Sequence, residues 1–186
     1  MPVTLGDLGP RICILGPSNS GKSTLADMIA RSRGHAPIHL DQLYHMLNTD
    51  WRPRPVEEFV TLHDAAIADE RWVMDGNYSR CMQQRFARST GVILLDVSTV
   101  TSLVRYLRRS WGKRDRIGGL DGGADSVKWD MIRHIAGAGR ENRRRYRSIL
   151  AGVSTPTIEL TSSRQITRFC QQEGLSRGNV VAELLS

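Results

Sequence analysis

The stretch GPSNSGKS at residues 16–23 constrains the fold more than any other part of the chain, because it matches the pattern G-x-x-x-x-G-K-[ST] in full. It follows the apolar run 12–15, and this run predicts a short buried strand over 11–15. It precedes residues 23–33, whose apolar spacing predicts a helix. A glycine-rich loop between a strand and a helix N-terminus directs backbone N–H groups toward an anion, and the helix dipole favours negative charge there. The pattern therefore predicts a loop that binds the phosphates of a nucleotide.

Each residue type in this loop suits a different part of a nucleoside triphosphate. Lys22 is expected to reach the β- and γ-phosphates, and the Ser23 hydroxyl is expected to ligate Mg²⁺. Thr24 is either an ordinary residue of the first helical turn or a hydroxyl partner of the α-phosphate. The residues predicted to hold the nucleotide are Gly16, Ser18, Asn19, Ser20, Gly21, Lys22, Ser23 and Thr24.

Strand and helix patterns alternate along the rest of the chain. The expected strands cover residues 11–15, 36–40, 71–75, 91–97 and 155–160. The expected helices cover residues 23–33, 56–69, a segment that begins after Ser98 or Thr99, and 164–173. Strands that alternate with helices imply a parallel sheet covered on both faces. We therefore expect an α/β, three-layer fold with a five-stranded parallel sheet and helices on both faces.

Acidic residues stand at or beside the ends of three of the predicted strands, namely Asp41, Asp75 and Asp96. In parallel sheets of this kind, ligands bind at the carboxyl ends of the strands. We therefore expect the three carboxylates to face the same crevice as the phosphate-binding loop.

The length of 186 residues suits a single domain over 1–186. We expect its core to comprise residues 10–41, 71–110 and 148–175. Two stretches interrupt the alternation of strands and helices. The first, residues 42–70, is expected to bind the phosphoryl acceptor. The second, residues 111–142, is rich in glycine and arginine and is expected to form a lid.

The net charge of +7 is concentrated in one segment, since residues 105–147 hold 13 Lys or Arg against 5 Asp or Glu. Nearly all of these cations are arginines, whose planar donors match phosphate oxygens. The segment is therefore expected to contact nucleotide phosphates, although a solvated basic surface or a patch that binds nucleic acid remains an alternative.

The three cysteines, Cys13, Cys81 and Cys170, are scattered and have no zinc-type spacing. Such sparse cysteines predict a reduced, cytoplasmic setting and no structural metal. No apolar run reaches the ~18 residues of a membrane span, so we expect no membrane partner. The chain is expected to be a monomer or a homodimer.

Four stretches carry a resemblance to a known family: residues 16–24, residues 39–41, the sequence WVMDGNY at 72–78, and residues 94–97 leading into a basic helix. With these motifs, the chain resembles nucleoside-monophosphate-kinase-type P-loop proteins. It is most similar to the adenylate-kinase-like proteins known as DNA topology modulation proteins. The resemblance spans residues 10 to 172, and WVMDGNY is its most specific element.

The resemblance implies roles for several residues. Asp75 takes the place of an aspartate that supports the water shell of Mg²⁺ in adenylate kinases. The residues that follow depart from the family signature, so an acceptor-phosphate contact falls to Arg80 or Arg85. The resemblance implies that Arg105, on the following helix, stacks on the ATP base and that Arg109, or its neighbour Arg108, contacts the transferring phosphate. On the returning limb of the lid, Arg143 and Arg144 are expected to lie over the phosphates.

Asp41 follows the second predicted strand, where shikimate-kinase-like relatives keep an acidic residue that faces the acceptor. Its carboxylate could accept a proton from an attacking hydroxyl, or it could cap a turn. The expected acceptor-binding segment contains Trp51, Arg52 and Arg54, and an indole beside guanidinium groups suits a flat ring and an anion. Trp51 could equally be a packing residue.

Together these features predict a small-molecule kinase that uses ATP and Mg²⁺. The acceptor is expected to be a nucleoside, a nucleotide or a hydroxyl-bearing metabolite, as in nucleotide, nucleoside or shikimate kinases. The alternative is a regulatory P-loop ATPase that binds nucleic acid through its arginine-rich segment. No helix-turn-helix, zinc or RNA-recognition signature favours that alternative.

Overall fold

A computed structural model describes residues 3–47, 49, 51–104, 146, 148–150 and 152–176 of the chain. Within these ranges the centre is a parallel sheet of five strands in the order β2-β3-β1-β4-β5. The strands are β1 (Arg11–Leu15), β2 (Ile38–His39), β3 (Trp72–Asp75), β4 (Gly91–Leu95) and β5 (Thr157–Leu160). The helices are η1 (Gly6–Leu8), α1 (Lys22–Ser32), α2 (Leu40–Tyr44), α3 (Val56–Ala68), η2 (Ser79–Cys81), α4 (Met82–Arg88) and α8 (Ser163–Gln172).

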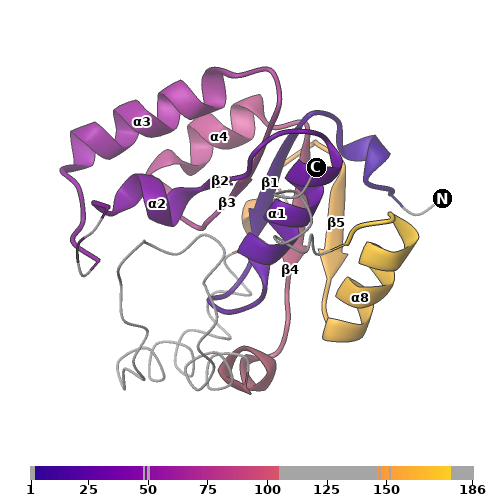
Figure 1. Ribbon diagram of the computed structural model, residues 1–186. Helices are drawn as coiled ribbons and strands as arrows, with labels where there is room; N and C mark the ends of the chain where they lie inside the picture. The colour runs from indigo at the N-terminus through magenta and orange to yellow at the C-terminus, as the bar shows by residue number, and fades with distance from the viewer. Residues whose placement is uncertain are drawn as a thin grey trace, which may run out of the picture.

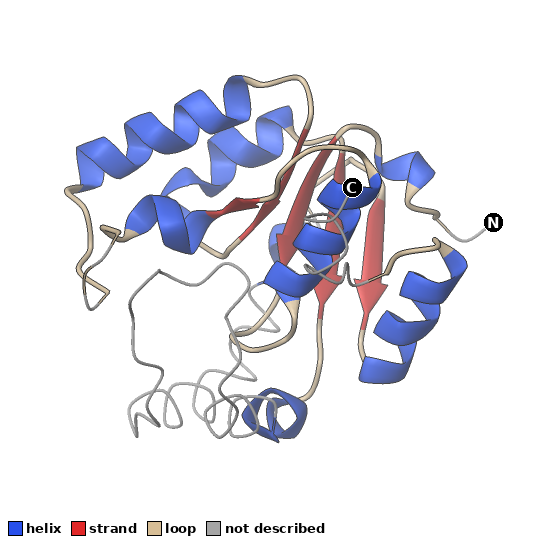
Figure 2. Cartoon of the chain, in the orientation of Figure 1, coloured by secondary structure: helices blue, strands red, loops and turns tan. Residues whose placement is uncertain are grey.

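Helices cover both faces of the sheet, because successive residues of each strand point to opposite sides. In β1, Ile12 and Ile14 pack into a core shared with α1 and α8, whereas Cys13 and Leu15 pack into a second core shared with α3 and α4. Figure 1 shows α8 beside β5, α1 in front of the central strands, and α3 and α4 toward β2 and β3. Figure 2 shows the strands between these two groups of helices. The three-layer α/β fold predicted from the sequence is confirmed.

The predicted element boundaries agree with the structure within about two residues, with one correction that matters for the site. The second strand was expected over 36–40, but β2 ends at His39 and Leu40 begins α2. Asp41 therefore lies in the first turn of a short helix and does not end a strand. The helix expected after Ser98 begins as predicted, since the Ser98 Oγ accepts a hydrogen bond from the Thr101 N–H at 3.1 Å.

Several expectations fall on residues that the structure does not describe. The lid over 111–142 is among them, as are Arg105, Arg109, Arg143 and Arg144. In the described part of the chain, no helix is long and apolar enough to cross a membrane. The same part of the chain contains no group of three or more His, Cys, Asp or Glu side chains arranged to hold a metal ion.

His63 on α3 gives the fold a pH dependence. Burial lowers the pKa of this imidazole below its ordinary value, although the contact of its Nδ1 with Asp64 at 2.9 Å opposes the shift. The unfolded chain therefore binds a proton more readily than the folded chain. Stability is expected to be full above the unfolded histidine pKa of about 6.5 and to fall as the pH drops through that value. Urea unfolding at stepped pH should show a shallower decline for His63→Leu than for the wild type, and an identical decline would contradict the assignment.

Candidate functional site

The loop between β1 and α1 begins at Gly16, whose backbone leaves the strand with a φ of +142°. A Cβ atom at this position would lie 2.4 Å from the backbone oxygen of Leu95. The loop therefore passes against the carboxyl end of β4 at a distance that glycine alone among the residue types permits. This close approach places the loop at the edge of the sheet where ligands bind in parallel α/β folds.

Two further residues give the loop its curvature. Asn19 has a φ of +61° and Gly21, which precedes α1 as its N-cap, has a φ of +100°. The Ser20 N–H donates to the Pro17 carbonyl at 3.2 Å and closes a turn inside the loop. Left-handed residues among ordinary ones turn successive N–H groups to one side, which is the backbone geometry that binds anions. The loop predicted to bind phosphates thus has the conformation that this role requires.

Lys22 lies in the first turn of α1, and its side chain folds back over the loop. Its Nζ donates a hydrogen bond to the Pro17 carbonyl at 2.8 Å. The ammonium group is therefore held beside the loop. The flexible four-carbon stem of the lysine would let it move from Pro17 to phosphates bound there.

Ser23 joins the loop to the end of β3. Its Oγ donates to Oδ2 of Asp75 at 2.8 Å, and Oδ1 of the same carboxylate contacts Nδ1 of His39 at 2.5 Å. Asp75 is 5% exposed and His39 is 7% exposed. A hydroxyl beside a carboxylate offers the hard oxygen ligands that Mg²⁺ prefers, either directly or through its water shell. The two residues predicted to support the metal, Ser23 and Asp75, are therefore in contact.

The last residue of β3 and the three residues after it connect the phosphate-binding loop to the acceptor side. These residues, 75–78, are here called the β3 strip. The side chain of Asn77 binds the peptide groups of Gly16 on both sides, since its Oδ1 accepts from the Gly16 N–H at 3.3 Å and its Nδ2 donates to the Gly16 carbonyl at 2.6 Å. Gly76, with a φ of +127°, lets the strip pass close to Leu40.

Asp41 is the acidic residue on the acceptor side. Its Oδ1 accepts a hydrogen bond of 2.7 Å from the hydroxyl of Tyr78, the last residue of the β3 strip. The Tyr78 ring packs against Tyr44 and Phe59, with centroid distances of 4.8 Å and 5.2 Å. The half-buried Asp41 is thus oriented by a tyrosine that is itself held between α2 and α3.

The segment after α2 folds back as a small antiparallel hairpin. The Met46 N–H donates to the Arg52 carbonyl at 2.9 Å, and the Arg54 N–H donates to the Tyr44 carbonyl at 2.8 Å. Trp51 has a φ of +56°, a strained conformation for a large residue, and its ring lies 5.1 Å from that of His45.

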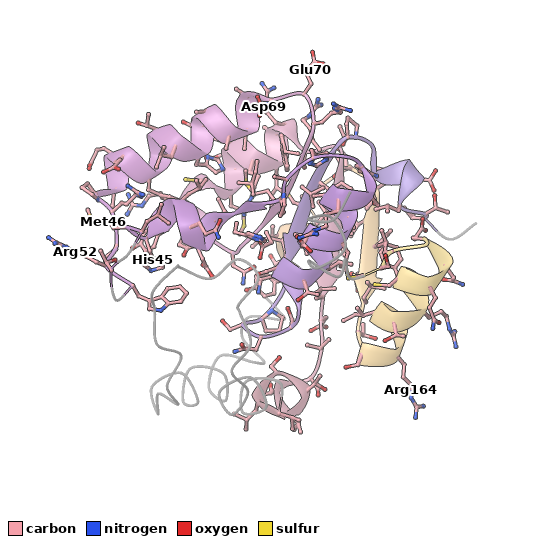
Figure 3. The ribbon with its side chains drawn as sticks, viewed as in Figure 1. His45, Met46, Arg52, Asp69, Glu70 and Arg164 are labelled. Atoms are coloured by element: carbon pink, nitrogen blue, oxygen red, sulfur yellow. The ribbon has the colours of Figure 1, made fainter. Side chains whose placement is uncertain are left out.

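One arginine of this hairpin points outward, and the other pairs with an acidic residue of α3. Figure 3 shows the Arg52 side chain directed away from the body of the molecule, and the residue is exposed. The guanidinium of Arg54 pairs at 2.6 Å with Glu58, which lies four residues later in the first turn of α3.

The two arginines after the β3 strip lie in opposite environments. Arg80 is exposed on η2, whereas Arg85 on α4 is 0% exposed. All three guanidinium nitrogens of Arg85 lack a hydrogen-bond partner in the described part of the chain. Burial lowers the pKa of Arg85, while nearby Cys13, Cys81 and Asp75 oppose that shift. The same burial raises the pKa of the Cys13 thiol to about 11, which keeps this neighbour protonated.

Replacing this buried cation should stabilise the protein. Arg85→Met keeps the unbranched stem of the side chain and removes a charge whose burial is not offset by hydrogen bonds to the described residues. We expect the free energy of unfolding in urea to rise by about 1–3 kcal/mol. Arg80→Met, which alters an exposed arginine five positions earlier, is the matched control and should change it by less than about 0.5 kcal/mol. A destabilised Arg85→Met variant would show that the guanidinium stabilises the fold.

The structure brings together most of the predicted site residues that it describes. The loop residues 16–24, Asp75 and Asp41 gather along the carboxyl edge of β1, β2 and β3. Arg52, Arg54 and Arg80 lie at the periphery on exposed or paired positions. Sequence reasoning missed the three side chains that fix the site: His39, Asn77 and Tyr78. Their position in the sequence could have identified them as site residues, because they lie next to predicted ones. His39 stands two residues before Asp41, and Asn77 and Tyr78 directly follow Asp75 and Gly76.

Comparisons with known proteins agree with this architecture. No family model matches the chain, and no curated protein matches it significantly. Among solved structures, a gluconokinase from Sinorhizobium meliloti 1021 matches 89% of this chain and 90% of its own, with a TM-score of 0.54 and 13% identity. TT1252 from Thermus thermophilus matches 94% and 97%, with a TM-score of 0.45 and 17% identity. Deoxyadenosine kinase from M. mycoides, solved with bound dCTP, matches 88% and 98%, with a TM-score of 0.41 and 13% identity. The gluconokinase likeness supports a P-loop kinase fold.

Proposed function

We propose that this protein is an ATP-dependent phosphotransferase that moves the γ-phosphoryl group of ATP to a hydroxyl group of a small molecule. One observation carries the proposal. The β3 strip contacts the phosphate-binding loop twice, through Asp75 at Ser23 and through Asn77 at Gly16. Its last residue, Tyr78, contacts the acidic side chain of Asp41. A loop shaped for phosphates and a carboxylate suited to a base are thus tied to one short segment.

On the donor side, residues 16–24 hold the triphosphate through their backbone N–H groups. Lys22 exchanges its contact with the Pro17 carbonyl for the β- and γ-phosphate oxygens. Ser23 directly, and Asp75 through water, are the residues that would hold Mg²⁺. When bound, this ion neutralises charge on the phosphate oxygens.

On the acceptor side, Asp41 takes the proton of the attacking hydroxyl. Tyr78 orients this carboxylate through its 2.7 Å hydrogen bond. Among the arginines of the neighbouring hairpin, Arg52 points outward and Arg54 pairs with Glu58. With a carboxylate as the proposed base, the acceptor that we propose is a neutral hydroxyl compound, such as a nucleoside or another hydroxyl-bearing metabolite, and not a nucleotide. Trp51, Arg52 and Arg54 remain the proposed contacts for the rest of the acceptor, and the exposed Arg52 would have to turn inward to make its contact.

The arginine-rich segment completes the proposal. We assign residues 111–142 to a lid over a single domain, with 42–70 as the acceptor-binding insert. In this arrangement Arg105 contacts the ATP base, whereas Arg109, Arg143 and Arg144 contact the transferring phosphoryl group. Closure over the site would exclude water, which otherwise competes as the acceptor. This division is the one that the sequence resemblance to adenylate-kinase-like topology modulation proteins implies.

The proposal is tested by incubating the protein with γ-labelled ATP, Mg²⁺ and a panel of acceptors: nucleosides, nucleoside monophosphates, sugars and small alcohols. We expect the label on a neutral hydroxyl compound, with one ADP formed for each product. Labelled nucleoside diphosphates would contradict the choice of a hydroxyl acceptor. Release of free phosphate that only duplex DNA stimulates would favour the regulatory ATPase instead.

A further inference from the structure

His39 and Asp75 form a buried pair that the sheet itself creates. The two residues stand opposite one another in the parallel register of β2 and β3, so their side chains leave the sheet on the same face. Their side chains are each 7% exposed, and Nδ1 of His39 lies 2.5 Å from Oδ1 of Asp75. Since a carboxylate oxygen accepts hydrogen bonds, Nδ1 of His39 is assigned as the donor in this contact.

The two oxygens of Asp75 are divided between two donors. Oδ1 contacts His39, and Oδ2 accepts from the Ser23 hydroxyl at 2.8 Å. A carboxylate held at one oxygen can still turn about its last bond, whereas one held at both oxygens keeps a single orientation. The Ser23 hydroxyl can keep donating to Oδ2 while a lone pair of its oxygen faces the ion of the proposed Mg²⁺ site, so Ser23 and His39 together hold Asp75 at both oxygens. Without His39, only Oδ2 is held and the carboxylate can turn.

We propose that His39 is a positioning residue of the phosphotransfer site: its Nδ1–H holds Asp75 so that Oδ2 faces Ser23 and the water shell of the nucleotide-bound metal ion. This inference rests on the proposed function and concerns the same site. A donor behind a carboxylate that contacts a metal or its waters orients the ligand, and removing such a donor costs about 10–100-fold in metal affinity.

Three substitutions separate positioning from packing. His39→Asn places an amide N–H where Nδ1 stands, His39→Gln moves its amide one bond further from the backbone, and His39→Leu keeps an apolar side chain without a donor. We expect His39→Leu to lower the Mg²⁺ affinity of the protein with a non-hydrolysable ATP analogue by about 10–100-fold. His39→Asn should restore most of that loss, and His39→Gln should restore little.

The measurement is titration calorimetry of the analogue in the presence of EDTA and at stepped Mg²⁺ concentrations. Binding in EDTA should be the same for the wild type and the variants, since the loop itself is unchanged. Adding His39→Leu to an Asp75→Ala background should have no further effect on the Mg²⁺ dependence. If His39→Leu does not fold, the difference between the Asn and Gln variants supplies the test.

The outcomes distinguish this inference from the proposed function. If the wild-type protein binds no analogue with or without Mg²⁺, the proposed function fails. If Mg²⁺ strengthens binding to the wild type and equally to His39→Leu, or if Asn and Gln behave alike, the positioning role fails and the proposed function stands. Equal weakening in EDTA and in Mg²⁺ would assign His39 to the packing of the loop and would also overturn the inference.

Discussion

The Lys22→Ala variant is expected to lose phosphoryl transfer, with kcat reduced on the order of 10³-fold. In the proposed site, the ammonium group moves from the Pro17 carbonyl, which it contacts at 2.8 Å, to the phosphate oxygens on which charge develops. Alanine removes that charge and leaves the backbone of the loop unchanged, so the melting temperature should change little. Steady-state turnover with the acceptor identified by the labelling panel measures the effect.

The matched control is Arg31→Ala, which removes a cation from the same helix. The Arg31 side chain is 44% exposed and pairs with Asp27 at 2.9 Å, away from the loop. It should retain nearly all of the wild-type kcat, because an exposed ion pair contributes little to stability or to the site. A Lys22→Ala variant as active as this control would contradict the assignment of the loop.

The Asp41→Asn variant is expected to lower kcat by about 10²–10⁴-fold with nucleotide affinity unchanged. The amide keeps the shape of the side chain and can still accept the hydrogen bond from Tyr78, but it cannot take a proton from the attacking hydroxyl. The loss should therefore fall on the chemical step, which single-turnover kinetics measures directly. Binding of a non-hydrolysable ATP analogue provides the parallel measurement of affinity.

Glu57→Gln is the control for Asp41→Asn, since it neutralises an exposed carboxylate in the same acceptor-side segment. It should leave kcat unchanged. A phosphate acceptor is already an anion and needs no base, so an Asp41→Asn variant with wild-type kcat would exclude the proposed hydroxyl acceptor and favour a nucleotide. The substitution thus tests the role of one residue and the class of acceptor together.

Local pattern predicted the loop and the order of the elements well. The strand, glycine-rich turn and helix around residues 11–32 are contiguous, so sequence spacing defines them without knowledge of the rest of the fold. The alternation of strands and helices likewise implied the parallel sheet. The short helices α2 and α4 escaped prediction because five and seven residues are too few to show a helical period.

The contacts within the site depend on register between distant segments, which one sequence does not reveal. His39 meets Asp75 because β2 lies beside β3 in one particular register, and Asn77 meets Gly16 because β3 lies beside β1. Arg85 shows a different limit. A charged side chain in a short amphipathic stretch is expected at the surface, yet this guanidinium is fully buried.

The most direct test of the central claim is a crystal structure of the protein with Mg²⁺ and a non-hydrolysable ATP analogue. We predict that the β- and γ-phosphates lie inside the loop of residues 16–23, with Lys22 moved from the Pro17 carbonyl to the phosphates. The Ser23 hydroxyl should face the metal ion, with Asp75 behind its water shell. A triphosphate bound elsewhere, with Lys22 still on Pro17, would contradict the account.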